Sequence, residues 1–119
     1  MKKNIYVLED NDDIRELISF LLTEENYNVS GYPTVKSFKK KMLYACPDMV
    51  VLDVRLSDGN GIEVCDALKA DKRTNKIPVL MMSAHTYLAE VKQQCEAEDF
   101  ISKPFDINDF VSRIDHYLH

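Results

Sequence analysis

The sequence lacks the cysteine pattern of a disulfide scaffold or a structural zinc site. Its three cysteines, Cys46, Cys65 and Cys95, are odd in number and widely spaced, and none belongs to a Cys-x-x-Cys pair or a His/Cys cluster. We therefore expect reduced cysteines and a fold held by an apolar core. A chain of 119 residues is long enough to bury such a core, so we predict one domain over residues 1–119.

Long apolar runs and strong positive charge are also missing. No stretch approaches the roughly 18 apolar residues of a membrane span, and the acidic pair Glu9-Asp10 comes too early for a signal peptide. The formal net charge is −5, and Lys39-Lys40-Lys41 forms the only basic cluster. These features predict a cytoplasmic protein that binds neither membranes nor nucleic acid directly. We interpret the three lysines as a solvated helix face.

The sequence contains short apolar runs that alternate with longer segments of helical period. This alternation predicts an α/β fold of five βα units with a doubly wound, mainly parallel sheet. Runs rich in Val, Ile and Leu that end in polar residues are typical of strands buried on both faces. The expected strands cover residues 5–8, 27–32, 49–52, 77–82 and 100–102.

The helical segments have recognisable starts and apolar stripes. Asp12 or Asp13 is expected to cap the first helix and Thr34 the second, whereas Cys46-Pro47 should end the second helix and Asp106 begin the last. Glycines in residues 56–61 predict a loop after the third strand. The fourth helix has so few apolar residues on one face that we expect it to be loosely held. We expect these side chains to face inward: Ile14, Leu17, Ile18, Leu21 and Leu22; Val35, Phe38 and Met42; Ile62, Cys65 and Leu68; Leu88, Val91 and Cys95; Ile107, Phe110, Val111, Ile114 and Leu118.

Acidic residues follow two of the expected strands. Glu9 and Asp10 end the first apolar run, and Asp53 ends the third. The carboxyl ends of parallel strands share one edge of the sheet, where open α/β sheets bind ligands. Three carboxylates meeting there repel one another unless a cation or a proton compensates, and Mg²⁺ is a hard cation that prefers oxygen ligands. We therefore predict that Glu9, Asp10 and Asp53, with one main-chain carbonyl from the following loop, hold Mg²⁺.

Two further polar residues end the fourth and fifth expected strands, and they complete a phosphoryl-transfer site. Asp53 is the candidate nucleophile and would form an aspartyl phosphate. Ser83 would donate its hydroxyl to one phosphoryl oxygen, and the Lys103 ammonium would pair with another. Any one of these residues alone is more often a surface or core residue. Their joint placement favours the functional interpretation.

The chain resembles the receiver domains of bacterial two-component response regulators over nearly its whole length. The matching features are the acidic pair, Asp53 with Gly61 eight residues later, Ser83-Ala84 after a buried strand, and the segment from Phe100 to Phe105 that contains Lys103-Pro104. The resemblance implies a flavodoxin-like (βα)5 fold with strand order 2-1-3-4-5. It also implies that Asp53 is the phosphoacceptor, that Arg55 lends its main-chain carbonyl to the metal, and that the Lys103-Pro104 bond is cis.

The resemblance further implies a switch. Ser83 would move toward the phosphoryl group and Phe100 would turn inward, which reshapes the surface around the fourth helix and fifth strand. Arg55 and His85, two residues after Asp53 and Ser83, would flank the route of an attacking water. Glu9, Phe100, Ser57 and Glu96 depart from residues common in the family, and none of these departures removes the acid, serine and lysine set.

The leading hypothesis is a single-domain response regulator that accepts a phosphoryl group from a sensor histidine kinase or a histidine phosphotransfer protein. It would be no enzyme beyond assisting its own phosphorylation and dephosphorylation. With no output domain after His119, it would act through a downstream effector protein, a phosphorelay or a missing effector region, and a phosphorylation-dependent dimer is compatible with the last helix. One alternative is a pseudo-receiver, a protein-binding module without phosphorylation. Another is a flavodoxin-like cofactor module or a small phosphohydrolase, which the lack of a Gly-rich loop or P-loop disfavours.

Overall fold

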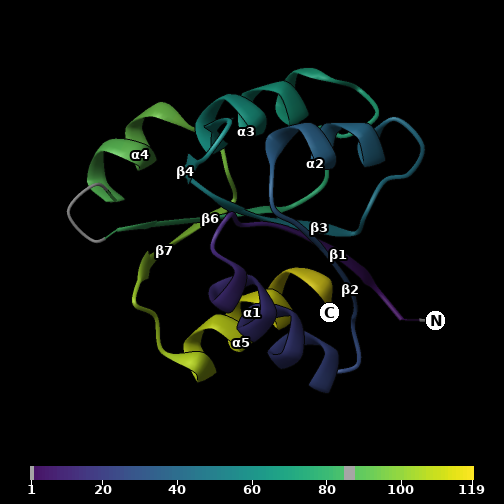
Figure 1. Ribbon diagram of the computed structural model, residues 1–119, viewed down its shortest axis with the longest axis vertical. Helices are drawn as coiled ribbons and strands as arrows, with labels where there is room; N and C mark the ends of the chain where they lie inside the picture. The colour runs from purple at the N-terminus through teal and green to yellow at the C-terminus, as the bar shows by residue number, and fades with distance from the viewer. Residues whose placement is uncertain (1, 85–87) are drawn as a thin grey trace.

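A five-stranded parallel sheet forms the middle layer of the molecule (Figure 1). The structure is a computed structural model and describes residues 2–84 and 88–119. The strand order is β2-β1-β3-β6-β7, and all four pairings in this sheet are parallel. Because β6 and β7 are its fourth and fifth strands, the predicted order 2-1-3-4-5 is confirmed. The strands are β1 (Asn4–Leu8), β2 (Asn28–Tyr32), β3 (Met49–Asp53), β6 (Val79–Ala84) and β7 (Asp99–Lys103).

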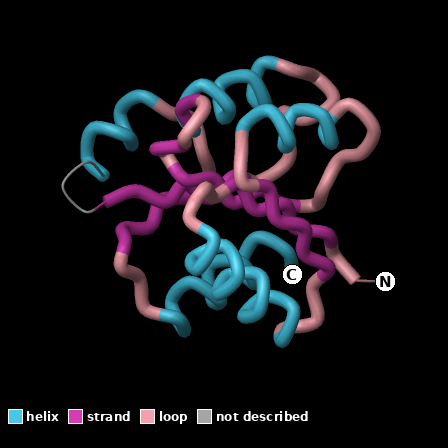
Figure 2. The backbone as a smooth tube through the Cα atoms, viewed as in Figure 1, coloured by secondary structure: helices cyan, strands magenta, loops and turns pink. Residues whose placement is uncertain are grey.

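Helices cover both faces of the sheet (Figure 2). Helices α1 (Asp12–Glu24) and α5 (Ile107–Leu118) lie on one face, and α2 (Val35–Met42), α3 (Gly61–Ala70) and α4 (Leu88–Gln94) lie on the other. Alternate strand residues point to opposite faces, so the core divides into two apolar clusters. None of these helices, within the ranges the structure describes, has the length and apolar character needed to span a bilayer.

The apolar stripes of α1 and α5 are narrower than predicted. Ile18 and Leu22 of α1, and Phe110 and Ile114 of α5, are fully buried. The predictions for Leu17 and Ile107 are wrong, since these side chains are 45% and 47% exposed. Leu17 lies about 100° around α1 from Ile18 and so outside the stripe that this helix buries. Ile107 shares a face with Ile114, seven residues later, but it is the first residue of α5 and stays exposed at the helix end.

Several predicted helix boundaries also need correction. The side chain of Asn11, rather than Asp12 or Asp13, caps α1 by accepting a hydrogen bond from the Ile14 amide at 3.0 Å. Thr34 caps α2, as predicted, and Asp106, the predicted first residue of the last helix, is the N-cap residue just before α5. Helix α2 ends at Met42, before the predicted Cys46-Pro47 stop, and β6 begins after Pro78.

The segment that was predicted to be a loop after Asp53 contains a small hairpin. Strands β4 (Arg55–Leu56) and β5 (Gly59–Asn60) pair in antiparallel orientation. Gly61 then begins α3, and a Cβ built there would lie 2.1 Å from the Asp53 carbonyl oxygen. Only glycine fits this approach of the helix to the end of β3, so the hairpin returns the chain tightly against Asp53.

Truncating a core aromatic side chain tests the packing of α5 on the sheet. Phe110 is fully buried and stacks on Phe105 with ring centroids 4.7 Å apart. We expect Phe110→Ala to lower the free energy of unfolding by about 3–5 kcal/mol, because the truncation leaves a cavity. Phe20, which is 61% exposed, is the matched control, and Phe20→Ala should change stability by no more than about 0.5 kcal/mol. Urea unfolding of both variants measures the difference, and equal losses would contradict the assigned core.

Candidate functional site

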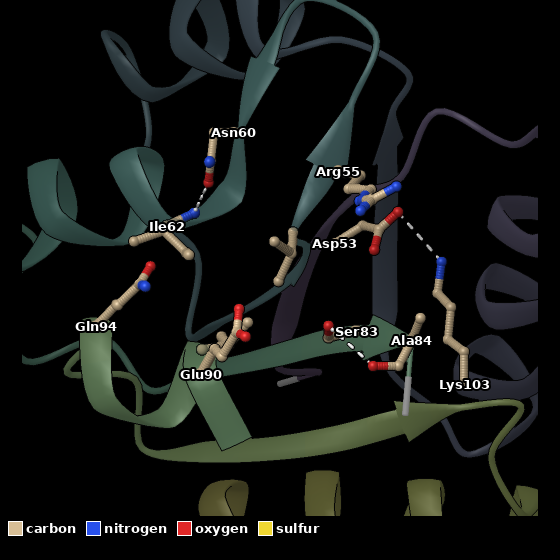
Figure 3. Close-up of a pocket in the computed structure, with 11 residues that line it drawn as sticks. Asp53, Arg55, Asn60, Ile62, Ser83, Ala84, Glu90, Gln94 and Lys103 are labelled. Atoms are coloured by element: carbon tan, nitrogen blue, oxygen red, sulfur yellow. Dashed lines mark hydrogen bonds and ion pairs between the residues drawn. The ribbon is translucent and has the colours of Figure 1, made fainter. Parts of the chain in front are cut away.

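The carboxyl ends of β3, β6 and β7 bring Asp53, Ser83 and Lys103 to one edge of the sheet (Figure 3). Asp53 is the last residue of β3, Lys103 is the last of β7, and Ser83 lies next to the end of β6. The strand register places these residues at nearly the same level along the strands. Asp53 of β3 pairs with Met82 of β6, and Ala84 of β6 pairs with Lys103 of β7. Asp53 and Ser83 are both buried although they are polar, with exposed fractions of 7% and 3%.

Three carboxylates form a compact acidic cluster at this edge. Glu9 and Asp10 follow β1, and one oxygen from each of Glu9, Asp10 and Asp53 lies within 4.8 Å of the other two. Glu9 is 1% exposed, whereas Asp10 faces solvent. Desolvation, followed by the neighbouring Glu9 carboxyl, raises the pKa of Asp10 above its usual value. Crowded carboxylate oxygens are the donor set of a hard divalent cation, so the cluster fits such an ion.

The Lys103 ammonium compensates part of this negative charge. Its Nζ pairs with Oε1 of Glu9 and lies 3.2 Å from Oδ2 of Asp53. Desolvation is the largest single influence and lowers the pKa of Lys103, but its hydrogen bond to Glu9 and the charge of Asp53 outweigh that influence, so the pKa is raised. Lys103 was predicted to meet a phosphoryl oxygen, and its pairing with the acids was missed. The excess of carboxylates in the sequence was the signal for a cation here.

Of the two predicted switch residues, Ser83 lies at this edge, whereas Phe100 lies near the start of β7, where it pairs with Met81 of β6. The Ser83 hydroxyl donates to the Ala84 carbonyl at 3.3 Å. Phe100 is half-buried and packs against the apolar cluster under α2, α3 and α4, and its carbonyl oxygen accepts a hydrogen bond from Arg113 at 2.8 Å. The movements expected of both residues stay predictions. The Lys103-Pro104 bond is cis, which confirms what the resemblance implied.

A cavity of about 440 Å³ opens beside Asp53 and extends toward α4 (Figure 3). Arg55 lines it from the hairpin, so the residue predicted to supply a carbonyl lies beside the acid cluster, whereas His85 lies outside the described residues. Sequence reasoning missed Asn60, Glu90 and Gln94 as site residues. Polar residues on a short hairpin, or on a helix with few apolar residues, have the same sequence pattern as ordinary surface residues. The cavity is lined by Asp53, Val54, Arg55, Asn60, Ile62, Ser83, Ala84, Glu90, Val91, Gln94 and Lys103.

Removing the Lys103 ammonium should destabilise the fold, because it leaves the buried carboxylates without their counter-charge. In EDTA at pH 8 we expect Lys103→Met to lower the free energy of unfolding by about 3 kcal/mol, because Glu9 then keeps a buried charge without its partner. Urea unfolding measures the loss, with Lys40→Met on the exposed face of α2 as the control. A loss equal to that of the control would contradict the role of this ion pair.

Comparison with known proteins gives the family of the chain. A family model described as the response regulator receiver domain matches residues 5–115. Response regulator ArlR of Staphylococcus epidermidis is 33% identical over 111 residues, which are 93% of this chain and 50% of that protein. The phosphate regulon transcriptional regulatory protein PhoB of Escherichia coli is 32% identical over 116 residues, which are 96% of this chain and 51% of that protein. The chain thus spans about half the length of the curated relatives it matches.

Solved structures agree on the fold. A putative response regulator from Chloroflexus aurantiacus superposes with a TM-score of 0.92 at 22% identity, covering 99% of this chain and 98% of the other. Full-length FixJ from B. japonicum gives a TM-score of 0.86 at 27% identity, covering 99% of this chain and 58% of FixJ. The match of the family model over most of the chain, together with these relatives, shows that the chain belongs to the response regulator receiver domain family.

Proposed function

We propose that Asp53 accepts a phosphoryl group from a phosphohistidine in a Mg²⁺-dependent reaction, and that the chain signals through the resulting change of its surface. One observation carries this proposal. The buried Asp53 carboxylate borders a cavity of about 440 Å³, with a lysine bonded to it, a buried serine beside it and two further carboxylates around it. Such a site combines a nucleophile, a cation for phosphoryl oxygens and oxygen ligands for a metal.

Each residue of the site has a separate role in the proposed reaction. An Asp53 oxygen forms a bond to phosphorus as the phosphorus–nitrogen bond of the donor breaks and the donor imidazole leaves. Lys103, already 3.2 Å from Asp53 Oδ2, pairs with a phosphoryl oxygen, and the Ser83 hydroxyl turns from the Ala84 carbonyl toward another. Glu9, Asp10, Asp53 and the Arg55 carbonyl would hold Mg²⁺, which when bound neutralises charge on the phosphoryl oxygens.

The proposed switch follows from a change in charge at Asp53. A phosphoryl group adds about one negative charge and three acceptor oxygens to this carboxylate, by analogy with other phosphorylated residues. Lys103 and Ser83 are then drawn toward the group, and their strands, β7 and β6, carry the change to α4 and Phe100. Helix α4 supports such a shift because it has seven residues and, of its own side chains, buries only Val91.

The proposal extends to partners and location. Residues 1–119 would act as a cytoplasmic receiver domain, phosphorylated by a sensor histidine kinase or a histidine phosphotransfer protein and read by a downstream effector protein. The chain would be no enzyme beyond assisting its own phosphorylation and dephosphorylation. PhoB is named as a transcriptional regulatory protein, so a transcriptional output is compatible with the family, whereas direct nucleic-acid binding by this chain is not proposed. A phosphorylation-dependent dimer stays a prediction.

Intact mass after incubation with acetyl phosphate tests the phosphoacceptor. With Mg²⁺ we expect one added phosphoryl group per chain, and we expect Asp53→Asn to abolish the adduct because an amide oxygen is a much weaker nucleophile. Asp66→Asn, which removes an exposed aspartate of α3, is the matched control and should label like the unmodified protein. Undiminished labelling of Asp53→Asn would refute the assignment. If the unmodified chain gains no mass and also binds no beryllofluoride, the pseudo-receiver alternative would replace the proposal.

The metal is tested by thermal unfolding with and without Mg²⁺. We expect Mg²⁺ to raise the Tm of the unmodified protein, and Asp10→Asn to weaken Mg²⁺ affinity about tenfold. In EDTA the same variant should be slightly more stable than the unmodified protein. The raised pKa of Asp10, caused first by desolvation and then by Glu9, marks a carboxylate whose charge is unfavourable without a cation. Solvent screening keeps this gain to about 0.5 kcal/mol. An equal response to Mg²⁺ in both proteins would contradict the ligand assignment.

A further inference from the structure

The first turn of α2 is capped by a residue from a distant part of the chain. The amide N–H groups of Val35 and Lys36 donate to Oδ1 and Oδ2 of Asp58, at 2.8 and 3.1 Å. Thr34 and Ser37 satisfy the other two amides reciprocally, since the Thr34 hydroxyl oxygen accepts from the Ser37 amide at 3.0 Å and the Ser37 hydroxyl oxygen accepts from the Thr34 amide at 3.3 Å. A helix normally relies on its own flanking residues for these bonds. Here Asp58, 23 residues beyond Val35, supplies two of the four.

Asp58 lies at the tip of the β4–β5 hairpin. Arg55 pairs with Asn60 and Leu56 with Gly59, which leaves Ser57 and Asp58 as the turn. Gly59 touches α2 as well, because a Cβ built there would lie 2.9 Å from Cγ2 of Val35. Hydrogen bonds from the amides of Val35 and Lys36 lower the pKa of Asp58 below its usual range, so the carboxylate is ionised at neutral pH. The hairpin is thus joined to α2 by a charged cap and a close backbone approach.

The base of the hairpin adjoins the acidic edge. The Val54 amide donates to the Met82 carbonyl at 3.0 Å, and the Gly61 amide donates to the Val54 carbonyl at 2.8 Å. Arg55 and Asn60 line the cavity next to Asp53. The hairpin therefore runs from the candidate metal and phosphoryl site to the first turn of α2 within six residues, 55–60.

We propose that Asp58 is a positioning residue that fastens the β4–β5 hairpin to α2, fixes the backbone after Asp53 beside the acidic cluster, and couples occupancy of that cluster to the first turn of α2. The proposal rests on the proposed function, because the site beside the hairpin is the Mg²⁺ and phosphoryl site. It adds a route from that site to α2, separate from the surface of α4 and β7.

The physical basis is preorganisation. A carboxylate at a helix N-terminus forms charge-assisted hydrogen bonds with amides whose dipoles favour negative charge. A short exposed hairpin without such an anchor samples many positions, and a main-chain ligand that it carries must then be ordered when the metal binds. Coupling is reciprocal: if the cap increases Mg²⁺ affinity, Mg²⁺ must strengthen the cap by the same factor.

The test compares Asp58→Ala with Asp48→Ala. Asp48 is the matched control because it is an exposed aspartate whose Oδ2 accepts a backbone hydrogen bond, from the Asn4 amide at 2.7 Å, at the opposite edge of the sheet. Titration calorimetry measures the Kd for Mg²⁺, and NMR hydrogen exchange measures the protection of the Val35 and Lys36 amides with Mg²⁺ and with EDTA.

We expect Asp58→Ala to weaken Mg²⁺ binding about tenfold, as loss of a supporting residue around a metal site commonly does, and Asp48→Ala to stay within about twofold of the unmodified protein. Mg²⁺ should slow exchange of the Val35 and Lys36 amides in the unmodified protein and in Asp48→Ala, but not in Asp58→Ala. Asp58→Asn keeps one acceptor oxygen and should recover part of both effects. Recovery by this variant separates positioning from a loss of fold.

Equal Mg²⁺ affinity in Asp58→Ala and Asp48→Ala would overturn the proposal, as would exchange at Val35 and Lys36 that does not respond to Mg²⁺ in the unmodified protein. These results leave the proposed function standing, because Asp53 can still bind Mg²⁺ and label with acetyl phosphate. Absence of Mg²⁺ binding by the unmodified protein would instead overturn the proposed function, and the role of Asp58 with it.

Discussion

The ion pairs of Lys103 with Glu9 and Asp53 are the interaction on which the site depends. Burying carboxylates is costly unless positive charge and hydrogen bonds compensate, and Glu9 and Asp53 are almost completely buried. The lysine comes from β7 and the acids come from β1 and β3, so the pairs also tie the end of an edge strand to the centre of the sheet. The same ammonium therefore compensates part of the negative charge at the acidic edge and, under the proposed function, would also meet a phosphoryl oxygen.

Parallel strand pairing makes this arrangement possible. Apolar strands buried on both faces leave polar side chains no place except the strand ends, and parallel pairing puts the ends of β1, β3, β6 and β7 on one edge. After the β4–β5 hairpin, Gly61 brings the start of α3 back against the Asp53 carbonyl. Site residues from four distant segments of the sequence meet because the strand order and register of one sheet place the ends of their strands side by side.

Much of this could be predicted from the sequence, because hydrophobic periodicity fixes which segments are strands and the ends of parallel strands share an edge. That reasoning placed Asp53, Ser83 and Lys103 together. It missed the contact of Lys103 with the acids, since local pattern does not say where a flexible side chain points. It also missed the β4–β5 hairpin, because two-residue strands have no period to detect. Leu17 was assigned to the core because apolar residues outnumber the positions that one face of α1 can bury.

The shared lysine has a further consequence for the order in which the site fills. Lys103 is tethered, so its local concentration beside Glu9 and Asp53 is constant, whereas that of a diffusible cation varies with the surroundings. A metal ion entering the cluster competes with this internal cation, and a divalent ion brings more charge than the ammonium it displaces. Once displaced, the ammonium is free to receive an anion. Under the proposed function, this competition would favour binding of the cation first and of the phosphoryl group second, so that reaction with the donor would depend on the concentration of divalent ion.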